Sequence, residues 1–105
     1  MEDAARIEVD AERRRIDAID EELVRLLARR GRAAATIGAI KRRIGAPVRD
    51  TDREETVRTH VRSLVAGTGL DPAALERIFD AIMALCRDLE EHDARRRAPR
   101  EGTSS

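Results

Sequence analysis

The 105-residue chain has almost no aromatic side chains, since Phe79 is its single Phe, Tyr or Trp. This excludes a base-stacking platform for single-stranded nucleic acid, which needs several rings. The chain also has a formal net charge of zero, because 21 basic residues balance 21 acidic ones. Nucleic acids and anionic membranes attract proteins with a net positive surface. We therefore expect no nucleic-acid partner and no membrane partner.

Long apolar runs and paired cysteines are absent as well. No run approaches the roughly 18 apolar residues of a membrane-spanning helix, and the polar N-terminus lacks the apolar segment of a signal peptide. Cys86, the single cysteine, suits a reducing compartment, so we predict a cytoplasmic protein. Its spacing continues that of Phe79 and Met83, which favours a packing role. His60 and His92 have no ligand-spaced neighbours, so no metal site is expected.

What the chain does contain is typical of an all-α domain, with 41% apolar and 40% charged residues. The first predicted helix runs from about Ala11 to Ile44 and ends at Gly45-Ala46-Pro47, where glycine accepts a left-handed cap and proline cannot continue. Its apolar residues form a heptad pattern in which Arg30 occupies one apolar position. The pattern comprises Ile16, Ile19, Leu23, Leu26, Ala33, Ile37, Ile40 and Ile44.

Two shorter helices are predicted after it. The second begins near Asp50 or Thr51 and ends before Gly67. The third begins at Asp71-Pro72, an N-cap followed by proline in the first helical position, and its apolar pattern ends near Glu91. Their apolar faces comprise Val57, Val61, Leu64 and Val65 in the second helix and Leu75, Ile78, Phe79, Ile82, Met83, Cys86 and Leu89 in the third.

The first predicted helix is too long for a compact chain of this size. About 33 residues at 1.5 Å each span roughly 50 Å, whereas a 100-residue globule has a radius of gyration of about 13 Å. The overhanging heptad face needs a partner, and the simplest is a homodimer in which two long helices pack together. Within the chain we expect a flexible N-terminus over residues 1–10, a helical domain over 11–92 and a disordered tail over 93–105.

Several charged residues extend the predicted apolar faces, where an unpaired charge is costly. Lys41, the only lysine, projects from nearly the same side of the helix as Arg30, eleven residues earlier. Individually such residues have structural explanations: Arg30 could set the register, and Thr51 to Glu54 fits a capping box. Collectively they favour a polar pocket. The set comprises Arg30, Lys41, Asp50, Arg53, Glu54 and Glu90.

This pattern resembles the all-helical chorismate mutases, a class of short chains that form intertwined dimers. The resemblance covers about Arg13 to Glu90 and is carried by Arg13–Asp20, Leu26–Arg30, Ile37–Lys41 and, most specifically, Pro47–Glu54. It implies a three-helix protomer in an intertwined helical homodimer. It also implies the rearrangement of chorismate to prephenate in aromatic amino-acid biosynthesis, with no cofactor.

By this resemblance, Arg13 matches the arginine that reaches into the partner subunit's site and binds a substrate carboxylate. The spacing agrees, since Arg13 lies 17 residues before Arg30, roughly 25 Å along a helix, too far to share one pocket within a chain. Arg30 matches the second carboxylate-binding arginine, and Arg53 matches a further arginine that lines the site. The implied ligand is a small dianion, chorismate or a close analogue.

On the reacting side, Lys41 matches the donor to the ether oxygen, and Glu90 stands where many bacterial members have glutamine, the second donor. Because a carboxylate cannot donate, we hypothesise that Glu90 works protonated, its pKa raised by burial, so that activity declines as it ionises at higher pH. Asp50 and Glu54 match residues near the ring hydroxyl. Cys86 stands where a family member can carry a small polar residue.

Three alternatives stay open from the sequence. The first is a mutase of 4-amino-4-deoxychorismate in a specialised pathway, since Asp50 and Glu54 could bind an ammonium as readily as a hydroxyl. The second is an isochorismate pyruvate-lyase, because such enzymes share the fold and nearly the same pocket. The third is a non-catalytic helical dimer module, in which alanine at Arg13, Arg30 or Lys41 has no functional consequence.

Overall fold

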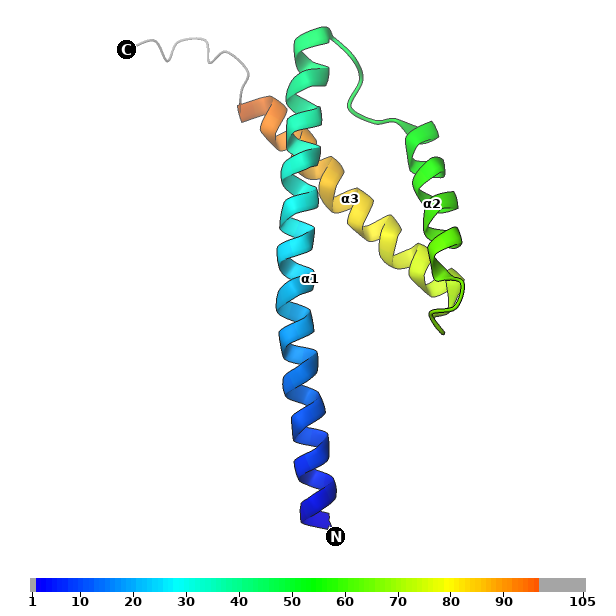
Figure 1. The fold of residues 1–105 in the computed structure, drawn as a ribbon. Helices are drawn as coiled ribbons and strands as arrows, with labels where there is room; N and C mark the ends of the chain where they lie inside the picture. The colour runs from blue at the N-terminus through cyan, green and yellow to red at the C-terminus, as the bar shows by residue number, and fades with distance from the viewer. Residues whose placement is uncertain (1, 97–105) are drawn as a thin grey trace, which may run out of the picture. The chain divides into compact units, whose positions relative to one another are not determined.

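The computed structural model describes residues 2–96, with side chains for residues 2–92. Three helices follow one another: α1 (Glu2–Ile44), α2 (Thr51–Val65) and α3 (Pro72–Arg96), with no strand in the described part of the chain (Figure 1). The prediction of an all-α chain with three helices is confirmed. No helix within the described residues is long and apolar enough to cross a membrane.

Two helix boundaries differ from the predicted ones. The first helix begins at Glu2 instead of about Ala11. The predicted start followed the apolar heptad pattern, which does not extend to the first ten residues of the helix. Its first ten residues include three alanines, two glutamates and one arginine, which favour helix, and Glu2 and Asp3 complement the helix dipole. The third helix continues to Arg96 instead of ending near Glu91, and residues 97–105 of the predicted tail lie outside the described residues.

The helix ends form at the predicted glycine, proline and aspartate residues. Gly45 has a positive φ of 72°, its N–H donates to the carbonyl oxygen of Arg42 at 3.3 Å, and the N–H of Ala46 donates to that of Lys41 at 2.8 Å. These two bonds form a Schellman motif that ends α1. At the start of α3, the carboxylate of Asp71 accepts a hydrogen bond from the N–H of Ala74 at 2.9 Å.

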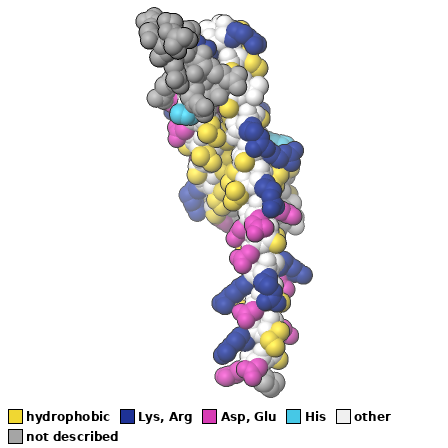
Figure 2. Space-filling view, turned by 90° about the vertical axis from the view of Figure 1, so that its left-hand side faces the viewer, with side chains coloured by type: hydrophobic (Ala, Val, Ile, Leu, Met, Phe, Trp, Pro, Cys, Tyr) yellow, Lys and Arg dark blue, Asp and Glu magenta, His cyan; other side chains and the backbone are white. Residues whose placement is uncertain are grey.

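The chain divides into two compact units, Met1–Arg30 and Gly31–Ser105. The described part of the first unit is a single stretch of helix, along which basic and acidic side chains alternate (Figure 2). Its heptad side chains are largely exposed: 53% for Ile16, 51% for Leu23 and 53% for Leu26. A helix with such an exposed apolar face is stabilised when that face packs against another apolar surface.

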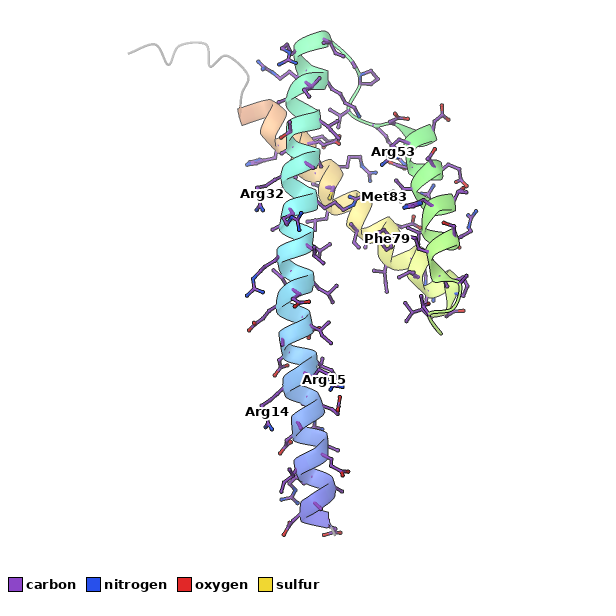
Figure 3. All side chains as sticks on the ribbon, in the orientation of Figure 1. Arg14, Arg15, Arg32, Arg53, Phe79 and Met83 are labelled. Atoms are coloured by element: carbon purple, nitrogen blue, oxygen red, sulfur yellow. The ribbon has the colours of Figure 1, made fainter. Side chains whose placement is uncertain are left out.

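In the second unit, α2 and α3 pack side by side around a small core. Val57 and Val61 of α2 pack against Met83 of α3, with Leu75 and Phe79 beside them (Figure 3). Ion pairs along the edge of this contact join Arg58 to Asp80 at 2.9 Å, Arg62 to Glu76 at 2.7 Å and Arg87 to Glu54 at 2.9 Å.

The apolar faces of these two helices are narrower than predicted. Leu64 and Ile78 are 57% and 55% exposed, because the face that the two helices share has room for only part of each predicted stripe. Cys86 is 4% exposed, which confirms its packing role. The buried residues of α1 are all small, namely Gly31, Ala34 and Gly38, and α3 crosses this part of α1 (Figure 1).

Candidate functional site

Lys41 lies in the last turn of α1, and its ammonium contacts two other segments of the second unit. The Nζ atom donates a hydrogen bond to the carbonyl oxygen of Val48 at 2.6 Å and lies 3.9 Å from Oε2 of Glu90. The side chains of Lys41 and Glu90 are only 20% and 14% exposed. Two residues 49 positions apart, both predicted to belong to the site, are thus brought together.

This arrangement leaves Lys41 able to bind a ligand. An ammonium has three N–H donors and no acceptor, and Val48 uses one donor along a fixed direction. A further N–H can therefore point at an oxygen atom of a bound molecule. Sequence reasoning missed the role of Val48, because a backbone carbonyl carries no residue-type signal.

Glu54, predicted to lie near the ring hydroxyl of a substrate, is held by three arginines. Its carboxylate lies 2.9 Å from Nη1 of Arg87, 3.3 Å from Nη2 of Arg49 and 3.9 Å from Nη2 of Arg58, and its side chain is 13% exposed. The partner on α3, Arg87, lies 33 residues away and was not predicted. Charge pairs at this separation have no local sequence signature.

A capping box from Thr51 to Glu54, the structural alternative for Glu54, does not form, because the N-cap is one residue earlier. Asp50 is the N-cap of α2, and its Oδ1 accepts a hydrogen bond from the backbone N–H of Arg53 at 2.9 Å. The Glu54 carboxylate turns instead to its arginine partners. Asp50 is exposed, and so is Arg53 in the first turn of α2 (Figure 3), whose guanidinium forms no ion pair with a described residue.

Arg13 and Arg30 belong to the first unit, whereas Lys41, Asp50 and Glu54 belong to the second. The Arg13 side chain is 72% exposed, and its Nη1 lies 3.7 Å from Oδ1 of Asp10, one turn earlier. An exposed pair at this distance contributes little to stability. The Arg13 guanidinium is therefore accessible to another molecule.

The neighbourhood of Glu90 on α3 is tightly packed. Cys86 lies one turn before Glu90 and is buried. A Cβ atom at Gly38 of α1 would lie 2.6 Å from the backbone oxygen of Glu90. The α3 backbone thus approaches α1 closely one turn before Lys41, which lies three residues after Gly38.

Two carboxylates, one on the neighbouring turn of α2 and one on α3, surround the guanidinium of Arg58. Its side-chain hydrogen bond to Asp80 raises the pKa of the Arg58 guanidinium, and the carboxylate of Glu55 adds to the effect. Arginine is charged at neutral pH in any case, so this pairing keeps a fixed positive charge beside Glu54.

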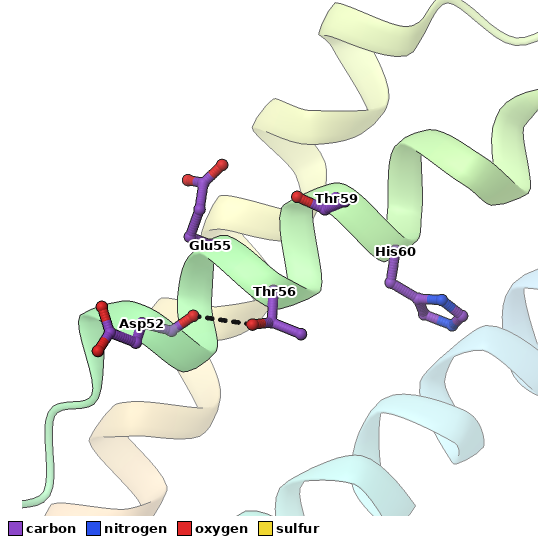
Figure 4. A pocket seen from close by; sticks show the side chains of 5 residues that line it. All are labelled: Asp52, Glu55, Thr56, Thr59 and His60. Atoms are coloured by element: carbon purple, nitrogen blue, oxygen red, sulfur yellow. Dashed lines mark hydrogen bonds between the residues drawn. The ribbon is translucent and has the colours of Figure 1, made fainter.

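An open hollow on α2 is lined by none of the predicted site residues. It is lined by Asp52, Glu55, Thr56, Thr59 and His60, all from one helix (Figure 4). The Thr56 hydroxyl donates to the backbone oxygen of Asp52 at 3.0 Å, so it is already satisfied. A hollow formed by one helix surface cannot enclose a ligand. Within residues 2–92, no three His, Cys, Asp or Glu side chains converge to hold a metal ion.

Comparison with known proteins identifies the family. Residues 12–91 match the family described as chorismate mutase type II. The chorismate mutase of Methanocaldococcus jannaschii is 30% identical over 71 residues, which are 68% of this chain and 72% of that protein. No solved structure matches the chain significantly.

Two longer relatives carry a similar segment. The bifunctional chorismate mutase/prephenate dehydratase of Aquifex aeolicus is 35% identical over 82 residues, 75% of this chain and 23% of that protein. The protein of the same name from Escherichia coli is 37% identical over 71 residues, 68% of this chain and 18% of that protein. The chain spans less than a quarter of these two relatives. From the match over residues 12–91, the chain belongs to the chorismate mutase type II family, as its sequence pattern predicted.

Proposed function

We propose that the chain is a chorismate mutase that rearranges chorismate to prephenate as a homodimer, with residues 11–92 as the active domain. The observation that carries this proposal is the convergence of Lys41, Glu90 and the Val48 carbonyl at one largely buried point. Membership of the chorismate mutase type II family supports it. The buried thiol of Cys86 suits a cytoplasmic enzyme.

The proposed reaction needs no nucleophile, because a pericyclic rearrangement breaks and forms its bonds in one step. The protein has to hold the compact conformer of the substrate and to stabilise the negative charge that grows on the breaking ether oxygen. In our proposal Lys41 and Glu90 donate hydrogen bonds to that oxygen. A rate gain of about 10⁶ corresponds to roughly 8 kcal/mol, which positioning and aimed donors can supply.

Arginines bind the two substrate carboxylates in this proposal, since guanidinium groups pair with carboxylates through two parallel hydrogen bonds. Arg30 binds one carboxylate within its own chain, and Arg13 of the partner subunit binds the other. The exposed guanidinium of Arg13, with its single long contact to Asp10, supports such a role. Arg53, exposed in the first turn of α2, lines the site, and Cys86 packs beneath it.

The homodimer is supported by apolar side chains that lack cover. Fifteen large apolar residues in the described chain are more than a third exposed, whereas the buried apolar core consists of six residues. Seven of the fifteen belong to the heptad pattern of α1. Exposed apolar surface of this extent marks a protein–protein interface. The heptad side chains concerned are Ile16, Ile19, Leu23, Leu26, Ile37, Ile40 and Ile44.

The surroundings of Glu54 favour a ring hydroxyl over a ring ammonium in the bound substrate. Arg49, Arg58 and Arg87 all lie within 4 Å of its carboxylate. These cations offset the negative charge that would attract an ammonium, whereas a hydroxyl can still donate to a carboxylate oxygen. We therefore propose chorismate as the substrate in preference to its 4-amino analogue, with Asp50 and Glu54 near the ring hydroxyl.

The test is a product assay with chorismate, isochorismate and 4-amino-4-deoxychorismate, each resolved by chromatography. We expect prephenate as the dominant product. If the amino product forms faster than prephenate, the substrate is 4-amino-4-deoxychorismate. If salicylate and pyruvate form from isochorismate faster than prephenate forms, the substrate is isochorismate. No turnover of the three compounds, by protein that is folded by circular dichroism, would contradict the enzymatic proposal and favour a non-catalytic dimer module.

A further inference from the structure

Gly38 lies where the α3 backbone comes closest to α1. A Cβ atom built on Gly38 would lie 2.6 Å from the backbone oxygen, 2.9 Å from Cα and 3.1 Å from the carbonyl carbon of Glu90. Carbon atoms in favourable contact lie about 3.5–4.0 Å apart. Because the atoms concerned are backbone, they cannot turn away as a side chain does. A side chain at residue 38 therefore requires α3 to move at Glu90.

Gly31, seven residues earlier, makes a different contact. A Cβ atom there would lie 2.7 Å from Cδ1 of Leu89, which is the end of a flexible side chain. Leu89 is 37% exposed, so it has room to change rotamer. Alanine at Gly31 can thus be accommodated without moving the helix. The two glycines form a matched pair, in which one meets a backbone and the other meets a side chain.

The close approach at Gly38 influences the distance between Lys41 and Glu90, the two donors in the proposed reaction. Gly38 and Lys41 lie three residues apart, on neighbouring positions of one helix face. Lys41 donates its 2.6 Å hydrogen bond to Val48, which lies outside α3, so this contact does not move with α3. The distance from Nζ of Lys41 to Oε2 of Glu90, now 3.9 Å, therefore depends on how closely α3 can lie against Gly38.

We infer that Gly38 is a positioning residue: by lacking a side chain, it sets the placement of Glu90 opposite Lys41. The expected effect on catalysis rests on the proposed function. The effect of Gly38 on the position of Glu90 does not depend on it. If the role of Gly38 is purely structural, replacing it affects folding but leaves the kcat of the folded chains unchanged. If Gly38 positions Glu90, replacing it lowers kcat even in chains that are fully folded.

The experiment compares Gly38→Ala with the matched control Gly31→Ala. Both variants are assayed with chorismate well below their unfolding temperatures, and both are crystallised. We expect Gly38→Ala to lower kcat between about 10- and 100-fold with a smaller change in KM, because a displacement of about 1 Å affects donors that act in the transition state. Gly31→Ala should keep kcat within about twofold of the wild type.

A second measurement tests whether the effect passes through Glu90. In a Glu90→Ala background, Gly38→Ala should lower kcat much less than in the wild type, since the displaced side chain is already gone. The crystal structure of Gly38→Ala should show Glu90 shifted away from α1, and that of Gly31→Ala should show a turned Leu89 with Glu90 in place.

Several outcomes would overturn the inference. One is an unshifted Glu90 in the Gly38→Ala crystal, and another is a Gly38→Ala effect of equal size with and without the Glu90 side chain. A Gly38→Ala chain that stays unfolded even in trimethylamine N-oxide, which favours folded proteins, would assign Gly38 to folding alone. Wild-type protein that does not convert chorismate would refute the proposed function, while a shifted Glu90 in the crystal would still support the positioning role.

Discussion

At the scale of single residues, the ammonium of Lys41 and the carboxyl group of Glu90 lie close together, and both side chains are largely buried. Lys41 has a fixed hydrogen bond to Val48 and lies 3.9 Å from a Glu90 carboxylate oxygen. Burial favours the neutral acid form of a carboxyl group, and a nearby ammonium favours the ionised form. Only the acid form can donate to an ether oxygen, so the two influences have opposite effects on the proposed reaction.

The role of Glu90 predicts a pH dependence. In the wild type, kcat should fall as the pH rises and Glu90 loses its proton, because the donor to the ether oxygen disappears. Glu90→Gln retains an N–H donor at every pH, so its kcat should stay level over the same range. Steady-state kinetics from pH 5 to 9 measure both profiles. Glu91→Gln, one residue along the helix, serves as the control and should keep the wild-type profile.

A level profile in the wild type would contradict the donor role of Glu90. The same holds if Glu90→Gln retains the wild-type decline. Either result would assign Glu90 to pairing with Lys41 alone.

The cations around Glu54 predict substrate selectivity. Arg87→Leu removes the closest cation, at 2.9 Å, and leaves Glu54 with more uncompensated negative charge. We expect the ratio of kcat/KM for 4-amino-4-deoxychorismate to that for chorismate to rise several-fold, about 1 kcal/mol of discrimination. Arg62→Leu removes a comparable pair between α2 and α3, with Glu76, and should leave the ratio unchanged. An unchanged ratio in Arg87→Leu would place Glu54 outside the substrate contact.

At the scale of the helices, local signals predicted the ends well. Gly45 and Asp71 terminate and start helices as their residue types indicate, because left-handed glycine and aspartate caps act over a few residues. The start of α1 was not found, since its first ten residues favour helix without an apolar pattern. The partner of Glu54 on α3 was also missed, because it depends on how two helices dock.

Gly31 and Gly38 interrupt an otherwise helix-favouring segment of the sequence. Glycine inside a helix costs about 1 kcal/mol relative to alanine, so Gly31 and Gly38 within α1 needed a reason. Their spacing of seven residues places both on one helix face. What contacts that face could not be deduced, because α3 reaches it only in the folded chain. The fold class was thus predictable from the sequence, whereas the distances between the predicted site residues were not.

The N-cap of α2 predicts separable effects on stability and binding. Asp50→Ala removes the acceptor for the N–H of Arg53 and should lower the free energy of unfolding by about 1 kcal/mol. Asp50→Ser keeps a capping oxygen and should restore most of this loss. Urea unfolding at one protein concentration measures both. If Asp50 also contacts the substrate, both variants should raise KM. If Asp50→Ser restores KM together with stability, the role of Asp50 is limited to capping the helix.

At the scale of the whole molecule, the small core and the exposed heptad face of α1 belong together. The six buried apolar residues in the described part of the chain, none of them fully buried, form a small core. Fifteen exposed large apolar side chains provide the surface that a second copy can cover. Folding and assembly should therefore depend on each other, with an unfolding temperature that rises with protein concentration.

The proposed donation of Arg13 to the partner's site predicts complementation. Arg13→Ala and Lys41→Ala should each be nearly inactive as homodimers. Mixed by unfolding and refolding at equal amounts, half of the dimers contain both variants, and each of these has one complete site. We expect about a quarter of the wild-type activity per chain. A mixture as inactive as its components would show that Arg13 and Lys41 serve the same chain, or that Arg13 has no role.

The end of α1 also constrains how the length of the chain can change over evolution. Gly38 provides the close approach to α3, and Lys41, three residues later, provides the ammonium. Gly45, four residues after Lys41, ends the helix. One inserted residue between Gly38 and Lys41 would rotate the ammonium by about 100° around the helix axis, away from Glu90. Insertions and deletions should accumulate in the turn at residues 66–70, and this segment of α1 should keep its length.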